Sequence, residues 1–243
     1  VIRQDNWTIQ CMLLNSDNLS IDNIKDISSL PPESIITIEG ELINVKNEVT
    51  GTTHKNFELH AKKVICDSQG EIIPIQVNDD FIDSNQDIRL NNRILDLRSS
   101  YNNAIFRIKS GVCRYFREYL TNLDFIEIQT PKLISTASEG GSEVFKVDYF
   151  DKNAYLAQSP QLYKQMCINS DFEKVFEVGP VFRAEKSVTH RHLTEFISLD
   201  MEMKIVDNYE EVQEVLYNLI VYIFDNLLKN YKKEIEVVNK KYM

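Results

Sequence analysis

The feature that most constrains the fold of this 243-residue chain is a change in the spacing of its apolar residues. Within residues 1–77 apolar and polar residues alternate, most regularly from Ile35 to Val45, as in strands with one buried face. From Ala104 onward apolar residues recur every three or four positions, which predicts a long amphipathic helix. We therefore expect an α+β protein, and its length allows two domains.

Residues 1–77 predict a small β-domain. Strand-forming residues are concentrated in three segments, residues 7–14, 35–45 and 57–65. Gly40 interrupts the second segment, where a barrel strand would bulge or bend. A polar stretch over residues 21–30 predicts one short helix before Pro31 and Pro32. Several short strands with one helix favour a Greek-key barrel of the OB type, although strand number alone leaves other small β-domains open.

The remaining chain predicts a linker followed by a larger mixed domain. Residues 78–98 begin polar and acidic and continue with spaced arginines, which is typical of a linker or hinge region. Residues 99–243 then form the expected second domain. Its predicted elements are a helix from Ala104, a strand over 124–131, strands over 175–185 and 192–203 around a polar loop, and a helix over 209–230.

Composition excludes several classes of protein. The net charge of −10 disfavours nonspecific coating of nucleic acid, which needs clustered lysine and arginine. No apolar run approaches the roughly 20 residues of a membrane-spanning helix, so we expect no membrane partner. The cysteines lack C-x-x-C spacing, which argues against a zinc site and predicts reduced, core-forming thiols in a reducing compartment. They are Cys11, Cys66, Cys113 and Cys167.

Four blocks after residue 103 carry a family resemblance. The stretches 179–185 and 189–196 resemble motif 2 of the class II aminoacyl-tRNA synthetases, with the pattern F-R-x-E, a polar loop and R/H-x-x-E-F. The predicted helix and strand that end at Pro131 resemble motif 1. Residues 138–141 and 155–165 are similar to the eukaryotic cytosolic aspartyl branch of the aspartyl, asparaginyl and lysyl subgroup. These blocks occur in the family's order, which makes the resemblance specific.

The resemblance implies a function and an architecture. The expected fold is an OB-type anticodon-binding barrel over residues 1–77, followed by part of a class II antiparallel-sheet catalytic domain over 99–243. The expected enzyme is an ATP-dependent ligase that converts L-aspartate to aspartyl-adenylate and transfers it to tRNA(Asp). The resemblance also implies that Mg²⁺ is a cofactor and that the enzyme is a cytoplasmic homodimer with Pro131 at the dimer interface.

The resemblance assigns an ATP site to motif 2. Arg183 is the expected catalytic residue, because a planar guanidinium can hold the α-phosphate and the aspartate carboxylate together. We expect Glu185 on the same strand face, where it would accept a hydrogen bond from the adenine amino group. Without the neighbouring blocks, Arg183 and Glu185 could equally form a salt bridge, and Phe196 could equally be a core residue. The implied ATP-binding residues are Arg183, Glu185, Arg191, His192, Leu193 and Phe196.

The resemblance also assigns two further binding sites. The aspartate site comprises Lys164 for the side-chain carboxylate, Gln161, Arg183, and Glu139 on a Gly140-Gly141 loop that closes on the α-amino group. The simpler alternative for Lys164 is an exposed helix lysine. Gln10 and Glu58 match positions that contact anticodon bases, although both would also suit exposed strand positions, and the family's stacking phenylalanine would fall before Val1.

Nothing after Met203 resembles motif 3, to which the family assigns an ATP-binding arginine. In the family, the Mg²⁺ ligands and the arginines for the aspartate carboxylates also lie in the half of the catalytic domain that carries motif 3. We therefore expect no metal site in this chain. We therefore expect an inactive fragment of a longer ligase. Two alternatives remain open, an asparaginyl-tRNA synthetase and a non-catalytic nucleic-acid-binding or interaction protein built on the same domains.

Overall fold

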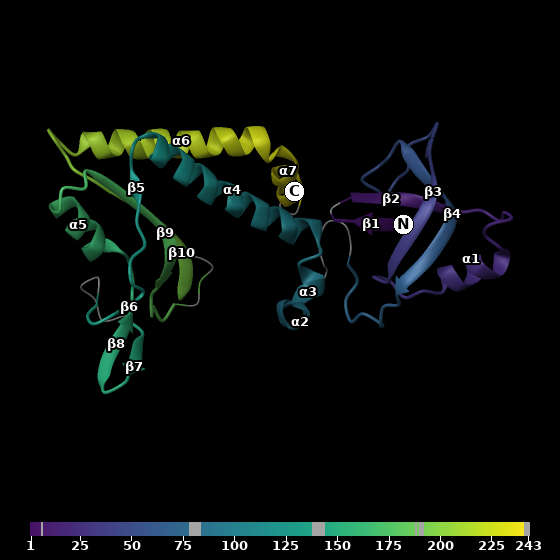
Figure 1. Ribbon diagram of the computed structural model, residues 1–243, viewed down its shortest axis with the longest axis horizontal. Coiled ribbons are helices and arrows are strands. Elements are labelled where there is room, and N and C mark those ends of the chain that lie inside the picture. The colour runs from purple at the N-terminus through teal and green to yellow at the C-terminus, as the bar shows by residue number, and fades with distance from the viewer. Residues whose placement is uncertain (6, 78–83, 138–143, 188, 190–191, 241–243) are drawn as a thin grey trace. The chain divides into compact units, whose positions relative to one another are not determined.

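A computed structural model describes residues 1–5, 7–77, 84–137, 144–187, 189 and 192–240 of the chain (Figure 1). The chain forms two compact units, Val1–Asn103 and Ala104–Met243. Among the described residues, no helix is long and apolar enough to span a membrane.

The first unit contains a four-stranded sheet and the helix α1 (Ile21–Ser28). Strand β2 pairs with β4 in parallel, and the other neighbours are antiparallel. The predicted helix and three predicted strands are therefore confirmed to within a few residues. Helix α1 begins at Ile21 because Ser20 and Asn23 form a capping box. In sheet order the strands are β1 (Ile2–Gln4), β2 (Trp7–Leu13), β4 (Phe57–Ser68) and β3 (Ile35–Asn44).

The interruption predicted at Gly40 is a β-bulge. The register between β3 and β4 shifts between Glu39 and Gly40. A Cβ atom on Gly40 would lie 2.3 Å from the carbonyl oxygen of His60, closer than real Cβ contacts. Only glycine therefore lets the two strands approach at this bulge.

Residues 84–103 are more structured than the predicted linker suggests. They form the short helices α2 (Gln86–Asn91) and α3 (Arg93–Asp96). The Asp96 side chain is completely buried, accepts a hydrogen bond from Arg89 Nε at 2.7 Å, and also pairs with Arg93. Burial raises the pKa of Asp96, but the two guanidinium groups outweigh it and hold that pKa below its usual value.

A second set of ion pairs joins residues 84–103 to the rest of the first unit. The Glu33 carboxylate pairs with Arg98 and with Arg3, whose Nη2 lies 2.5 Å away. Buried and half-buried charge pairs therefore replace the apolar contacts that a linker composition lacks.

The second unit is built on a three-stranded sheet covered on one face by two long helices (Figure 1). Strand β9 lies between β10, its antiparallel neighbour, and β5, its parallel neighbour. The predicted long helices are confirmed, with α4 starting in the first unit. The elements are α4 (Ser100–Asn122), β5 (Ile126–Glu127), β9 (Lys174–Phe182), β10 (Glu195–Met203) and α6 (Glu210–Asn230).

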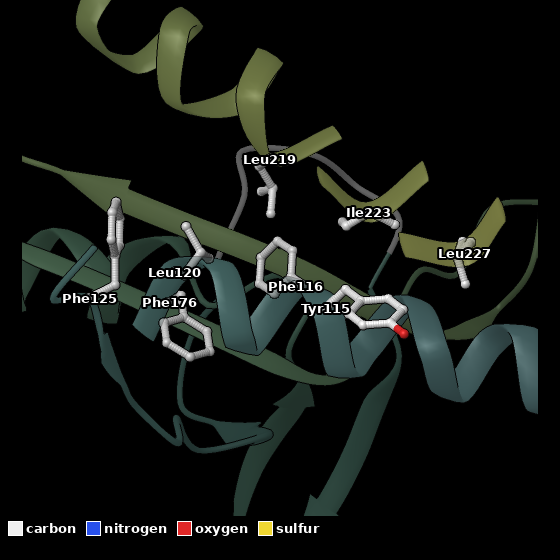
Figure 2. Packing of buried hydrophobic residues seen from close by; sticks show 8 residues of the cluster. All are labelled: Tyr115, Phe116, Leu120, Phe125, Phe176, Leu219, Ile223 and Leu227. Atoms are coloured by element: carbon white, nitrogen blue, oxygen red, sulfur yellow. The ribbon is translucent and has the colours of Figure 1, made fainter. Parts of the chain in front are cut away.

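The core of this unit lies between the sheet and the two helices. Figure 2 shows side chains of α4 and α6 pointing toward each other, with Phe176 of β9 below them. The ring of Phe116 meets that of Phe176 edge-on, with centroids 5.9 Å apart. The cluster comprises Tyr115, Phe116, Leu120, Phe125, Phe176, Leu219, Ile223 and Leu227.

Several elements of the second unit were not predicted. A small antiparallel sheet and two shorter helices escape detection because their segments are too short to show a sustained apolar period. The strand predicted over residues 124–131 is confined to β5, because Thr130 hydrogen-bonds to a side chain of β9 and not to its backbone. The additional elements are β6 (Leu133–Ile134), β7 (Lys146–Tyr149), β8 (Lys152–Leu156), α5 (Gln161–Asn169) and α7 (Lys232–Asn239).

The cysteine predictions are confirmed in one respect and wrong in another. All four thiols are free. Cys66 is exposed near the end of β4, so it is not a core residue, and the other three are half-buried. Burial raises the pKa of the Cys11 thiol.

The buried Asp96 carboxylate gives a prediction on stability. Asp96→Asn removes the charge that both arginines compensate, and we expect a loss of about 3 kcal/mol in unfolding free energy at pH 7. Because the folded pKa lies below the unfolded value of about 4, this contribution is present above about pH 4 and is lost as the pH falls toward the folded pKa. Urea unfolding of both proteins between pH 7 and pH 3 measures it.

The matched control for Asp96 is Asp22→Asn. Asp22 is exposed and pairs with Lys25 on the surface of α1, so its removal should change little at any pH. An Asp96→Asn variant as stable as wild type at pH 7 would contradict the assignment of a stabilising charge cluster.

Candidate active site

Strands β9 and β10 divide their side chains between two faces. Phe176, Val178, Leu199 and Met201 belong to the core or pack against it under α4 and α6. Since successive residues of a strand point to opposite faces, the residues between them lie on the other face. The register places Glu177 opposite Asp200 and Val181 opposite Phe196 on that face. Charged and aromatic side chains therefore gather opposite the apolar core.

Helix α5 brings Lys164 to this polar face. Lys164 is only 4% exposed, and its Nζ lies 3.2 Å from Asp200 Oδ1, 3.3 Å from the carbonyl oxygen of Met201 and 3.5 Å from Glu202 Oε2. The alternative of an exposed helix lysine is therefore wrong. A buried ammonium needs such partners, and the two carboxylates compensate its charge and orient it.

Two further side chains complete this lysine cluster. Gln161, at the start of α5, donates from Nε2 to Glu202 Oε2 at 3.3 Å. The Ser198 hydroxyl donates to the second oxygen of Asp200. The lysine cluster is thus Lys164, Gln161, Ser198, Asp200 and Glu202, held between α5 and β10.

The segment before α5 fixes the position of that helix. Gln158, Ser159 and Pro160 are buried, and Pro160 directly precedes the first turn. Ala157 accepts a hydrogen bond from the Phe182 backbone N–H at 2.9 Å, at the last residue of β9. The start of α5 is therefore anchored beside the end of β9, next to Arg183.

Arg183 lies just beyond β9. The strand predicted over 175–185 ends at Phe182, because the chain turns there into the loop toward β10. Arg183 and Glu185 therefore belong to the loop and not to the strand. One backbone hydrogen bond, from Arg183 N–H to the Thr194 carbonyl at 3.0 Å, still holds Arg183 in line with the sheet. Its guanidinium carbon lies 5.6 Å from the centre of the Phe196 ring, within cation–π range.

The loop between β9 and β10 contributes a histidine and a glutamate. His192 Nε2 lies 3.6 Å from Glu185 Oε2, and His192 Nδ1 lies 2.6 Å from Thr189 Oγ1. Leu193 is exposed beside them. Arg191 and Glu139, together with Gly140 and Gly141, lie outside the described residues.

The remaining predicted residues lie elsewhere. Gln10 and Glu58 are register partners on β2 and β4 of the first unit, and Gln10 Nε2 donates to Glu58 Oε1 at 2.6 Å. His60 Nε2 lies 3.5 Å from the other Glu58 oxygen. Pro131 is exposed, beyond the end of β5.

Sequence reasoning missed part of the polar face. It overlooked Asp200, Glu202 and Ser198, and also the neighbouring Glu177, Lys132 and Thr130. A usable signal was present in residues 195–203, where polar Ser198, Asp200 and Glu202 alternate with apolar residues. A strand with this alternation presents its polar residues together on one face.

The described residues contain no group of three or more His, Cys, Asp or Glu side chains placed to hold a metal ion.

Comparison with known proteins identifies the family. The profile of the family described as "tRNA synthetases class II (D, K and N)" matches residues 85–243. This chain belongs to the class II tRNA synthetases. The sequence resemblance is thereby confirmed, and the charged face opposite the core lies within the matched region.

Individual relatives resemble the chain over 90% or more of its length. It is 48% identical over 254 residues to the cytoplasmic aspartate–tRNA ligase of Bos taurus, covering 100% of this chain and 51% of the relative. An aspartyl-tRNA synthetase structure from Entamoeba histolytica has a TM-score of 0.86 at 39% identity, over 99% of this chain and 50% of that one. An asparaginyl-tRNA synthetase from Pyrococcus horikoshii has a TM-score of 0.80 at 33% identity, over 90% and 49%.

These similarities confirm the predicted fold class, an OB-type β-domain followed by a class II synthetase sheet. The chain spans about half the length of the curated relatives it matches.

Proposed function

We propose that the chain forms part of a cytoplasmic aspartate–tRNA ligase, which activates L-aspartate with ATP and transfers the aspartyl group to tRNA(Asp). The observation that carries this proposal is the buried Lys164 on the polar face of the sheet. A buried cation on α5 provides a partner for a substrate side-chain carboxylate, which an amide substrate would not require.

The lysine cluster supports recognition of a zwitterionic amino acid. The Lys164 ammonium would bind the side-chain carboxylate of aspartate, and Gln161 offers an amide in the same site. Asp200 and Glu202 hold Lys164 in place and add two negative charges to one positive charge. Further cations are therefore required for the substrate's two carboxylates, and Arg183 at the end of β9 is one of them.

Arg183 is the residue proposed to act in adenylate formation. Aspartate attacks the α-phosphate of ATP through its α-carboxylate oxygen, and pyrophosphate leaves. A guanidinium that binds both groups brings them together and stabilises the negative charge that develops between them. The Phe196 ring against Arg183 limits the orientations of the guanidinium, and it offers a surface on which adenine can stack.

The other assignments follow the resemblance and the geometry. Glu185 would accept from the adenine amino group, and His192 with Arg191 and Leu193 would contact the nucleotide. Glu139 would close on the α-amino group of aspartate. Mg²⁺ would accompany ATP, with ligands mainly outside this chain's described residues.

Two proposals concern macromolecular contacts. In the first unit, Gln10 and Glu58 present an amide and a carboxylate side by side, which suits contacts with anticodon bases. The parent protein is proposed to be a homodimer with Pro131 at its interface.

An asparagine-specific ligase is the second candidate, because a Pyrococcus horikoshii asparaginyl-tRNA synthetase shares the fold at 33% identity. The two functions differ at the substrate's side chain. Asparagine carries a neutral amide, for which a buried ammonium is a poor partner compared with a carboxylate.

The substrate assignment predicts an exchange assay. The full-length enzyme should catalyse ATP–pyrophosphate exchange that depends on aspartate and not on asparagine. Lys164→Met should raise the KM for aspartate by about a hundredfold, because an ionic hydrogen bond in a buried site is lost. Exchange that prefers asparagine would overturn the aspartate assignment.

A second prediction concerns Arg183. Arg183→Lys keeps the charge but loses the planar pair of donors, so the exchange rate at saturating substrates should fall by roughly 10²–10³-fold. The loss should appear in kcat more than in KM, because the contact strengthens in the transition state. Circular dichroism and melting temperature check that the fold is preserved, and a near wild-type rate would refute the role.

A further inference from the structure

A second buried carboxylate lies next to the lysine cluster. Glu177 is 4% exposed and stands directly opposite Asp200 in the β9–β10 register, on the same face of the sheet. Two carboxylates facing each other across a strand pair repel, and a buried charge without a partner is costly. The two groups therefore need separate compensation.

Each carboxylate has its own lysine. Lys132 Nζ lies 2.8 Å from Glu177 Oε1, whereas Lys164 Nζ lies 3.2 Å from Asp200 Oδ1. The backbone N–H and the hydroxyl of Thr130 also donate to Glu177, at 3.0 and 2.7 Å. Lys132 and Thr130 thus satisfy Glu177 without any contribution from Lys164.

The chain makes room for this second pair. A Cβ atom on Gly179 would lie 3.3 Å from Glu177 Oε1 and 3.6 Å from Lys132 Cε. The absence of a side chain at Gly179 thus leaves space for the lysine to reach the carboxylate.

Lys132 also contacts the segment that positions α5. Its carbonyl oxygen accepts a hydrogen bond from the Ala157 N–H at 2.9 Å, and the Ala157 carbonyl accepts from Phe182 N–H at 2.9 Å. The contacts therefore run from Glu177 through Lys132 and Ala157 back to β9. The Glu177–Lys132 pair is thus joined to the segment that precedes α5 and, through it, to the end of β9.

We propose that Lys132 is a positioning residue for aspartate binding: it neutralises Glu177, so that this carboxylate does not compete with the substrate carboxylate for the Lys164 ammonium. This inference rests on the proposed function, since it concerns the affinity of the same site for aspartate. Lys132 itself touches neither substrate in this account and acts through the charge balance around Lys164.

The two members of the pair should then act in opposite directions. Lys132→Met leaves an extra negative charge beside the site, which draws Lys164 away from the substrate and repels aspartate. Glu177→Gln removes a negative charge and leaves Lys132 as an additional cation, which favours aspartate. A purely structural ion pair would instead give both variants the same defect, because both lose the same contact.

The experiment measures aspartate-dependent ATP–pyrophosphate exchange by the full-length enzyme. Lys132→Met should raise the KM for aspartate about tenfold, the order expected for one uncompensated charge near a partly buried site. Glu177→Gln should leave that KM unchanged or lower it, and the double variant should return close to wild type. The KM for ATP should stay near the wild-type value in all three.

Thr130→Val is the matched control. It removes the hydroxyl that donates to Glu177 and accepts from Lys132 Nζ at 3.0 Å, without changing any charge, so it should lower the melting temperature and leave the KM for aspartate unchanged. If Lys132→Met does not fold, Lys132→Gln, which keeps a donor, gives the same comparison. A rise in the KM for aspartate in both Glu177→Gln and the Lys132 variant would overturn the inference.

Failure of the proposed function would look different. It would appear in the wild-type enzyme as the absence of aspartate-dependent exchange. Wild-type exchange that is sensitive to Lys164→Met but insensitive to Lys132→Met would contradict only the positioning role.

Discussion

The arrangement of the second unit depends on the pleat of one strand pair. Because side chains alternate along β9 and β10, a single pairing register sends the apolar residues toward α4 and α6 and the charged residues to the opposite face. A slip of one residue would place Asp200 and Glu202 in the apolar core. The packing of Phe176 against Phe116 therefore also determines where the charged groups stand.

On the polar face, charge compensation controls the geometry. Lys164 and Lys132 each reach a carboxylate of the strand pair from a different segment, and each interaction is largely removed from water. Replacing such a pair as a whole by apolar groups would change stability little, because desolvation offsets the attraction, whereas removing one partner leaves an uncompensated charge. The pairs therefore define where each group lies. In the first unit Asp96 plays a comparable role, since its two arginines hold short helices that have few apolar contacts.

The sequence predicted the long helices, the longer strands and the family, but not the short elements of the second unit or the side-chain partners. Alternation located β2, β3 and β4, the bulge at Gly40 follows from a missing side chain, and helical spacing located α4 and α6. The burial of Lys164 could not be predicted, because its partner Asp200 lies 36 residues away and meets it only when α5 packs on β10. Asp96 was missed for a similar reason. Its segment has the composition of a linker, because its charged residues find their partners only in the folded chain.

The central claim is that the polar face of β9 and β10, together with α5, binds aspartate and ATP. A crystal structure of the full-length enzyme with a non-hydrolysable aspartyl-adenylate analogue tests it most directly. The account predicts the substrate's side-chain carboxylate within hydrogen-bond distance of Lys164 Nζ, the phosphate on Arg183 and the adenine against Phe196. An analogue bound away from Lys164 and Arg183 would contradict it.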